Sequence, residues 1–160
     1  MNTTRVFLAA LLLLFAATLG CGHDPNLGQV SGIVTYKGEP VEGATVSFLP
    51  VSTDGVLAVG TTDADGRYVL AAPVQKGVSQ GAFSGTYNVT IRKLEVTPSE
   101  NDRLYQEGKI TYSELQSRGG GGGGTSRDIL PVRYRNAQQS GLEAEIQAKT
   151  RNEFNFDLVD

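Results

Sequence analysis

The chain has 160 residues, 39% of them hydrophobic, which is enough for one domain together with a leader segment. It carries 14 Lys and Arg against 17 Asp and Glu, and the basic residues form no dense cluster, which argues against nucleic acid as a partner. Glycine is abundant at 20 residues and tryptophan is absent. Short runs of Thr, Val and Tyr between the glycines favour an all-β chain.

Residues 1–20 are typical of a secretory signal peptide. Arg5 is the only charge there, and a largely apolar run of 14 residues extends from Val6 to Leu19. Such a run is too short for a transmembrane helix but suits the apolar core of a signal. Removal of this leader would leave 13 Lys and Arg (14 minus Arg5) against 17 acids, a net charge of −4.

Cys21, the only cysteine, directly follows this run. The sequence Thr18-Leu19-Gly20-Cys21 resembles a bacterial lipoprotein processing site, although that family usually has Leu and then Ala or Ser where Thr18 and Leu19 stand. The resemblance implies a diacylglyceryl group on the Cys21 sulfur, cleavage before Cys21 and acylation of the new amine. The alternative is an ordinary signal-peptidase cut that leaves a free thiol without a disulfide partner.

Several acyl chains would hold the protein stably on a membrane, facing the periplasm or the cell exterior. Gly22 after the cysteine, in place of aspartate, resembles the signal for outer-membrane sorting in double-membraned bacteria. Residues 21–28 are then expected to form a short lipidated tether, and residues 29–160 a single β domain with an insertion at 95–130.

Alternation of apolar and polar residues predicts strands over 30–36 and 44–49, joined by a turn at 37–40. Pro73 to Gly81 is expected to be a loop. The clearest strand runs from Gly85 to Lys93, with its odd-numbered apolar residues facing inward.

Two runs near the end of the chain have one apolar and one charged face, which is typical of antiparallel strands with one solvated side. The first run alternates Leu142, Ala144 and Ile146 with Glu143 and Glu145. The second alternates Phe154, Phe156 and Leu158 with Asn155 and Asp157.

Residues 61–70 are expected to be a hairpin, two extended arms joined by an acidic turn. In this turn Asp63 and Asp65 would accept hydrogen bonds from backbone N–H groups, and Gly66 would adopt a positive φ. The Asp63-x-Asp65-Gly66 spacing is also found in calcium-binding loops, and Asp54 could supply a further ligand. Because Tyr68 stands where an EF-hand loop needs a ligand, we predict a structural turn and no metal site.

The segment from 95 to 130 interrupts the strand pattern. Ser99 gives a weak helix start, and Thr111 with Glu114 forms a better capping box for a short helix through Arg118. The six glycines at 119–124 cannot hold a fixed structure on their own. We expect a mobile excursion over the surface, either functional or without a task.

Four motifs, at 30–34, 40–46, 62–68 and 85–89, together resemble the carboxypeptidase regulatory-like domain. The end of the chain, from Pro131 to Leu158, looks like the closing strands of small bacterial lipoproteins that carry this domain. The resemblance implies an all-β fold, a seven-stranded transthyretin-like or Ig-like antiparallel sandwich with a partly helical, Gly-rich insertion before the last strands. It does not imply one function, since such modules accompany many activities.

Few residues of this sequence are candidates for catalysis. His23 is the only histidine, so a Ser-His-Asp triad and histidine-based metal sites lack their residues, and no cofactor is expected. A Lys37–Asn155 isopeptide bond is disfavoured because Lys37 lies in a turn. Glu143 and Glu145 are expected on a solvated face rather than as a catalytic pair.

Tyr105, Tyr112 and Tyr134 lie outside the clear strands and could form a platform for sugars, or pack the insertion against the body. We therefore expect a non-enzymatic, lipid-anchored envelope protein that acts as a structural or interaction module, with an envelope protein or a glycan as partner. The alternative is a carbohydrate- or small-ligand-binding protein on the same scaffold.

Overall fold

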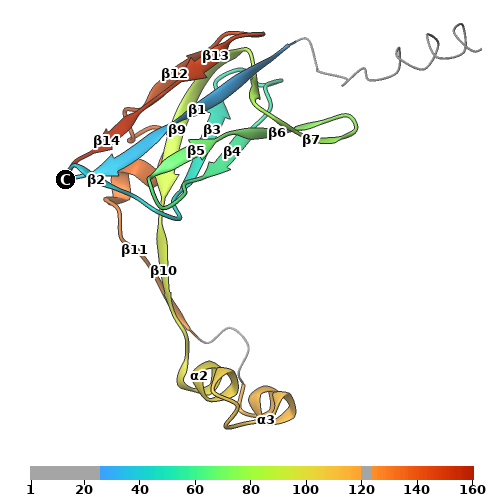
Figure 1. Cartoon of the computed structure of the whole chain (residues 1–160), viewed down its shortest axis with the longest axis vertical. Helices are drawn as coiled ribbons and strands as arrows, with labels where there is room; N and C mark the ends of the chain where they lie inside the picture. Colours follow the sequence, from blue (N-terminus) through green and yellow to red (C-terminus); the bar gives the residue numbers. More distant parts are fainter. Residues whose placement is uncertain (1–25, 120–123) are drawn as a thin grey trace, which may run out of the picture.

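A computed structural model describes residues 26–119 and 124–160, which are mainly β. Two six-stranded sheets form a compact part, and a two-stranded ribbon ending in two helices projects from it (Figure 1). We call residues 26–93 and 129–160 the body, and residues 94–128 the arm.

The first sheet is built around one long strand, β1, which pairs along its length with five short strands. The sheet contains β1 (Leu27–Tyr36), β2 (Glu39–Pro40), β5 (Arg67–Val69), β8 (Ala82–Phe83), β13 (Arg151–Glu153) and β14 (Phe156–Leu158). The alternation expected in β1 is present, with Val30 and Val34 buried. The turn predicted at 37–40 is shorter than expected: Lys37 and Gly38 both have positive φ and form a two-residue turn into β2.

The second sheet is antiparallel throughout, in the order β12-β9-β3-β4-β6-β7. Its strands are β3 (Thr45–Pro50), β4 (Ala58–Thr61), β6 (Ala71–Val74), β7 (Gly77–Gln80), β9 (Gly85–Arg92) and β12 (Glu143–Ile146). The inward-facing residues predicted for β9 are buried, as are Ala144 and Ile146 of β12, whereas Leu142, just before β12, is half-buried. Thr90, which was expected to face outward, is only 8% exposed.

The inner faces of both sheets share one hydrophobic core. Phe48 of β3 is fully buried at its centre, and four other rings lie with centroids 5.8 to 6.4 Å from it. These rings belong to Tyr68, Tyr87, Phe154 and Phe156. Since they come from both sheets, this cluster fixes the two layers against each other.

The hairpin predicted for residues 61–70 is wrong, although its turn is present. β4 pairs with β3 and β6 in the second sheet, whereas β5 pairs with β1 in the first. The turn therefore carries the chain from one sheet to the other. The alternating pattern predicts that Tyr68 and Leu70 face the core, and both residues are buried. Because both sheets face the same core, the pattern does not show which sheet the strand joins.

The loop predicted from Pro73 to Gly81 is also wrong, because β6 and β7 form a hairpin there that extends from the side of the body (Figure 1). β4 pairs with β6 only at Ala71. Pro73 lies beyond that ladder, so its missing N–H removes no bond to β4, as is typical of proline near a sheet edge.

The last run does not form the expected antiparallel strand. β13 and β14 both pair with β1 in parallel, and the break between them falls at Phe154 and Asn155. Asn155 Oδ1 accepts a hydrogen bond of 2.8 Å from the Ile33 N–H and so replaces a backbone acceptor at the break. β1 begins at Leu27, which is fully buried, so residues 27 and 28 belong to a strand rather than to the expected tether.

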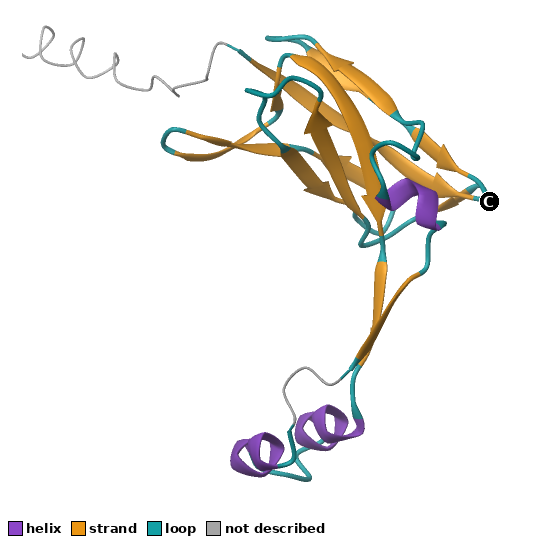
Figure 2. Cartoon of the chain, turned by 180° about the vertical axis from the view of Figure 1, so that it is seen from behind, coloured by secondary structure: helices purple, strands orange, loops and turns teal. Residues whose placement is uncertain are grey.

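The arm consists of β10 (Leu94–Thr97), α2 (Glu100–Gln106), α3 (Tyr112–Ser117) and β11 (Thr125–Asp128). β10 and β11 pair antiparallel, with Leu94 opposite Asp128 and Thr97 opposite Thr125. Figure 2 shows both helices at the far end of this ribbon, well away from the body. The insertion therefore does not lie over the surface of the body. Most of the six-glycine run, residues 120–123, lies outside the described part of the chain.

Candidate functional site

The tip of the arm is a pair of short helices whose starts follow the sequence closely. The Ser99 side chain accepts a hydrogen bond from the Asp102 N–H and caps α2. Thr111 and Glu114 form the complete capping box predicted for α3. Leu115 is the only residue of these two helices that is buried. The tip thus has good helix caps but almost no core.

Glu114 serves this capping box as a carboxylate. Its side chain accepts hydrogen bonds from the Thr111 N–H at 2.8 Å and the Thr111 hydroxyl at 2.9 Å. These bonds favour the ionised form, so they lower the pKa of Glu114 below its usual value. We therefore expect acid to weaken the start of α3.

Two tyrosines form an exposed aromatic pair at the tip. Tyr105 of α2 and Tyr112 of α3 are 43% and 61% exposed, and their rings meet edge to face with centroids 6.1 Å apart. Gln116 Nε2 donates a 2.9 Å hydrogen bond to the Tyr112 hydroxyl and orients that ring. This pair is the most distinctive surface feature of the arm.

The three-tyrosine platform, one of the two alternatives for these residues, does not form, because Tyr134 belongs to the body. It lies in the 3₁₀ helix η1 (Val132–Arg135), which packs against β9, and it is only 4% exposed. Its hydroxyl donates to the Val159 carbonyl at 3.1 Å and accepts from the Val159 N–H at 3.0 Å. Tyr134 therefore joins η1 to the end of the chain.

Asp128 joins the arm to the body. Its Oδ2 accepts hydrogen bonds from Arg92 at 3.2 Å and Arg135 at 3.4 Å, and its side chain is 10% exposed. Its Oδ1 is buried with no hydrogen-bond partner among the described residues. Three elements, β9, β11 and η1, meet at this carboxylate, which sequence analysis did not identify. These contacts fix the base from which the arm leaves the body.

The acidic turn has the structural role that was predicted for Asp63 and Gly66. Asp63 Oδ1 accepts hydrogen bonds from the Asp65 N–H at 3.0 Å and the Arg67 N–H at 2.8 Å. Gly66 has a φ of +74°, and a Cβ there would lie 2.5 Å from the Val34 carbonyl oxygen. Asp65 differs from the prediction, since its carboxylate pairs with the Arg67 side chain.

The structure does not assemble the alternative sites raised from the sequence. Asp54 accepts a hydrogen bond from Ser52 at the end of the β3–β4 pair opposite to Asp63. Within residues 26–119 and 124–160, no group of three or more His, Cys, Asp and Glu side chains could hold a metal ion. Lys37 Nζ pairs with Asp160 at 2.6 Å, and the Asn155 side chain bonds the Ile33 N–H and Glu153. Glu143 and Glu145 are exposed, as expected.

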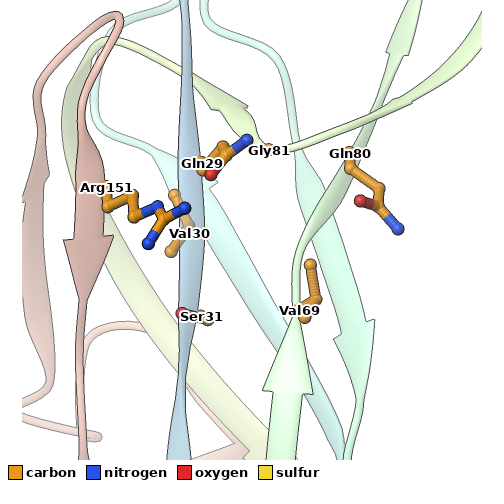
Figure 3. Close-up of a pocket in the computed structure, with 7 residues that line it drawn as sticks. All are labelled: Gln29, Val30, Ser31, Val69, Gln80, Gly81 and Arg151. Carbon is orange, nitrogen blue, oxygen red and sulfur yellow. The ribbon is translucent and has the colours of Figure 1, made fainter.

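A shallow hollow of about 300 Å³ lies on the outer face of the first sheet, near the start of β1 (Figure 3). Arg151 reaches from β13 across to β1, beside Gln29 and Val30. A second hollow of about 330 Å³ shares Gln29 and Arg151 and extends to Lys149. Neither Lys149 nor Arg151 forms an ion pair with the residues that the structure describes, so this face carries two available cations.

The N-terminal expectations fall outside the described residues, because Cys21 and the leader lie within 1–25. Over the described ranges, no helix is both long and apolar enough to cross a bilayer.

Comparisons with protein-family models, with curated proteins and with solved structures find no match to this chain.

Proposed function

We propose that this chain is a non-catalytic, lipid-anchored protein of the bacterial cell envelope whose arm contacts a partner. The observation that carries the proposal is the placement of the arm, which leaves the body away from the start of β1 (Figure 1). If Cys21 bears the lipid, five residues separate it from Leu27, a span of at most about 20 Å. The start of β1 would then face the membrane, and the arm would point away from it.

The chemistry of the tip supports a role in contact with another macromolecule. Tyrosine is enriched at protein interfaces and among the residues that dominate binding energy, because it has a large apolar face and a polar end. Tyr105 and Tyr112 present such faces on a tip whose helices bury almost nothing against the body. We propose that an envelope protein covers this pair.

A glycan is the second candidate partner, and one observation favours it. Tyr112 is held by the side-chain amide of Gln116, so an exposed ring face and a polar amide lie together at the tip. This combination offers stacking and hydrogen bonding to the same sugar ring. Photo-crosslinking from the arm distinguishes a glycan partner from a protein partner.

For the body, we propose the transthyretin-like sandwich that the sequence motifs resemble. Its support is that the motif residues contribute buried side chains to one core between two sheets: Val30, Val34, Val46, Tyr68, Tyr87 and Val89. Under this proposal the body is a rigid mount for the arm rather than the binding element itself.

The anchor is tested by Cys21→Ser in the full chain. We expect the wild-type protein to fractionate with membranes and its mature N-terminus to carry acyl chains by mass spectrometry. The variant should lack both acyl chains and cleavage before residue 21. Acyl chains missing from the wild-type N-terminus would refute the lipoprotein part of the proposal.

The arm is tested by photo-crosslinking from Ser113, next to the tyrosine pair, in native envelopes. A crosslinked product should disappear in Tyr105→Ser/Tyr112→Ser. The matched control is Val51→Ser/Leu57→Ser, because these body residues have similar exposures of 59% and 46%. A product that depends equally on both pairs would contradict a specific role of the tip. A crosslinked product whose added mass is removed by glycosidases, and which contains no second polypeptide by mass spectrometry, would identify a glycan.

A further inference from the structure

Among the described residues, two cations without ion pairs flank the start of β1, and a third lies on the neighbouring β6–β7 hairpin. Lys149 and Arg151 flank the first residues of β1, since the Lys149 N–H donates to the Leu27 carbonyl at 2.9 Å and Arg151 lies opposite Gln29. Lys76 lies in the turn of the β6–β7 hairpin. None of the three forms an ion pair within the described part of the chain.

The same hairpin carries an exposed apolar residue. Val78 is 75% exposed, the highest value among the large hydrophobic residues that the structure describes. It lies two residues from Lys76 on a hairpin that extends from the side of the body next to the start of β1 (Figure 1). An apolar side chain beside a lysine suits the boundary between headgroups and acyl chains, where the lysine's charge stays in water.

The acidic residues near these cations do not pair with them, so the cations can bind an external anion. Glu153 is the acid closest in sequence to Arg151 on β13, and its Oε1 already accepts a 3.1 Å hydrogen bond from Asn155. Glu145 lies on β12, in the other sheet. The hollow around Arg151 is open and lined by the neutral polar residues Gln29 and Gln80, so a phosphate group can approach the guanidinium (Figure 3).

We infer that this end of the body docks on the anionic phospholipid surface of the membrane, with Lys149 and Arg151 binding headgroup phosphates and the β6–β7 hairpin touching the bilayer. The inference rests on the proposed lipid anchor, which would hold this end within about 20 Å of the headgroups. Docking orients the body and directs the arm outward. Each basic residue near an anionic surface strengthens binding about five-fold, corresponding to about 1 kcal/mol, and only within about a Debye length.

The experiment replaces the natural anchor so that docking is measured separately from lipidation. Residues 22–160, which contain the whole described core, are held on vesicles by an N-terminal histidine tag and a nickel-chelating lipid. A donor dye on Gln75→Cys, at the exposed hairpin turn, reports energy transfer to acceptor headgroups. We expect a docked population on vesicles containing phosphatidylglycerol and much less of it on pure phosphatidylcholine.

Charge variants then decide the inference. Lys149→Gln/Arg151→Gln should lower the docked-to-free ratio about thirty-fold, which is two charges at about 1 kcal/mol each. The control Lys93→Gln/Arg118→Gln removes two other cations that form no ion pair with the described residues, and it should change the ratio less than two-fold. Equal ratios on both lipids, or equal losses in both variants, would overturn the inference.

Two further outcomes are distinguished. Micromolar binding of soluble glycerol phosphate to the unanchored chain would make the hollow a small-ligand site and would also overturn membrane docking. Because the anchor in this experiment is artificial, failure to dock leaves the lipidation of Cys21 to be judged by mass spectrometry alone.

Discussion

The body and the arm are held together by different means. In the body, five aromatic rings and the apolar faces of two sheets form one continuous core. In the arm, helices of seven and six residues bury only Leu115 between them. Helices of this length are not stable alone, since isolated helices shorter than about 12 residues are marginal in water.

This difference indicates which part can change without loss of the fold. The order of the arm depends on local contacts: the caps at Ser99 and Thr111, the β10–β11 ribbon, and the base at Asp128. None of these contributes to the core around Phe48. The arm can therefore be altered or occupied by a partner while the body stays folded, as the proposed function requires.

The largest effect is expected from Phe48→Ala. Because Phe48 is fully buried among four rings, its removal leaves a cavity and should lower the free energy of unfolding by about 4 kcal/mol. Denaturant unfolding measures this loss. The matched change in the arm, Leu115→Ala, should leave the unfolding of the body within about 0.5 kcal/mol. A similar loss in both variants would show that the arm is part of the same cooperative unit.

A smaller loss of stability is expected from replacing one of two glycines that have nearly the same backbone conformation. Gly66 and Gly108 have φ values of +74° and +68°, but a Cβ at Gly66 would meet the Val34 carbonyl, whereas a Cβ at Gly108 would have no atom of the described residues within 4 Å. Gly66→Val should destabilise the body by about 2 kcal/mol or more. Gly108→Val should leave the melting temperature of the body unchanged. Equal shifts of both melts would contradict the comparison.

The base of the arm is tested by Asp128→Asn. Arg92 and Arg135 would lose their shared carboxylate, but both are about half exposed, so the body should lose less than about 2 kcal/mol. The arm should instead vary more in direction. In a chain starting at Gly22, spin labels at Glu42→Cys and Ser113→Cys should give a broader distance distribution in the variant. An unchanged distribution would mean that Asp128 does not orient the arm.

The mildest perturbation is acid, which should affect α3 before the body. The folded-state pKa of Glu114 is lowered, so its stabilisation of α3 is complete above the unfolded pKa of about 4.3 and is lost as the pH falls through the lower folded value. Amide exchange and backbone chemical shifts of α3 would report this loss. Glu114→Gln keeps a capping side chain but cannot titrate, so its α3 should show a weaker pH dependence. An identical profile in both chains would exclude Glu114 as the cause.

Sequence patterns predicted faces and caps better than they predicted partners. Hydroxyl–acid spacing placed both helix starts. Alternation correctly placed the buried apolar residues of β1, β3, β9 and β12, but it did not predict the burial of Thr90 in β9. It could not assign β5 to the first sheet or make β13 and β14 parallel to β1, because an apolar face does not identify the neighbouring strand.

The candidate site shows the same limit. Tyr105 and Tyr112 were singled out as aromatic residues outside the strands, and they do meet. Tyr134 was grouped with them, but η1 packs against β9 and places its ring in the core. Asp128 was missed because its contacts bring together residues 92, 128 and 135, and no local pattern records that meeting.

The most direct test of this account is the stability of the body without its arm. Leu94 and Asp128 lie directly opposite each other, so residues 95–127 can be replaced by a two-residue Asn-Gly turn that keeps the contact with Arg92. Denaturant unfolding of this shortened chain should give a free energy within about 1 kcal/mol of the full chain. A chain that fails to fold, or that loses more than about 3 kcal/mol, would contradict the separation of a stable body from a projecting binding arm.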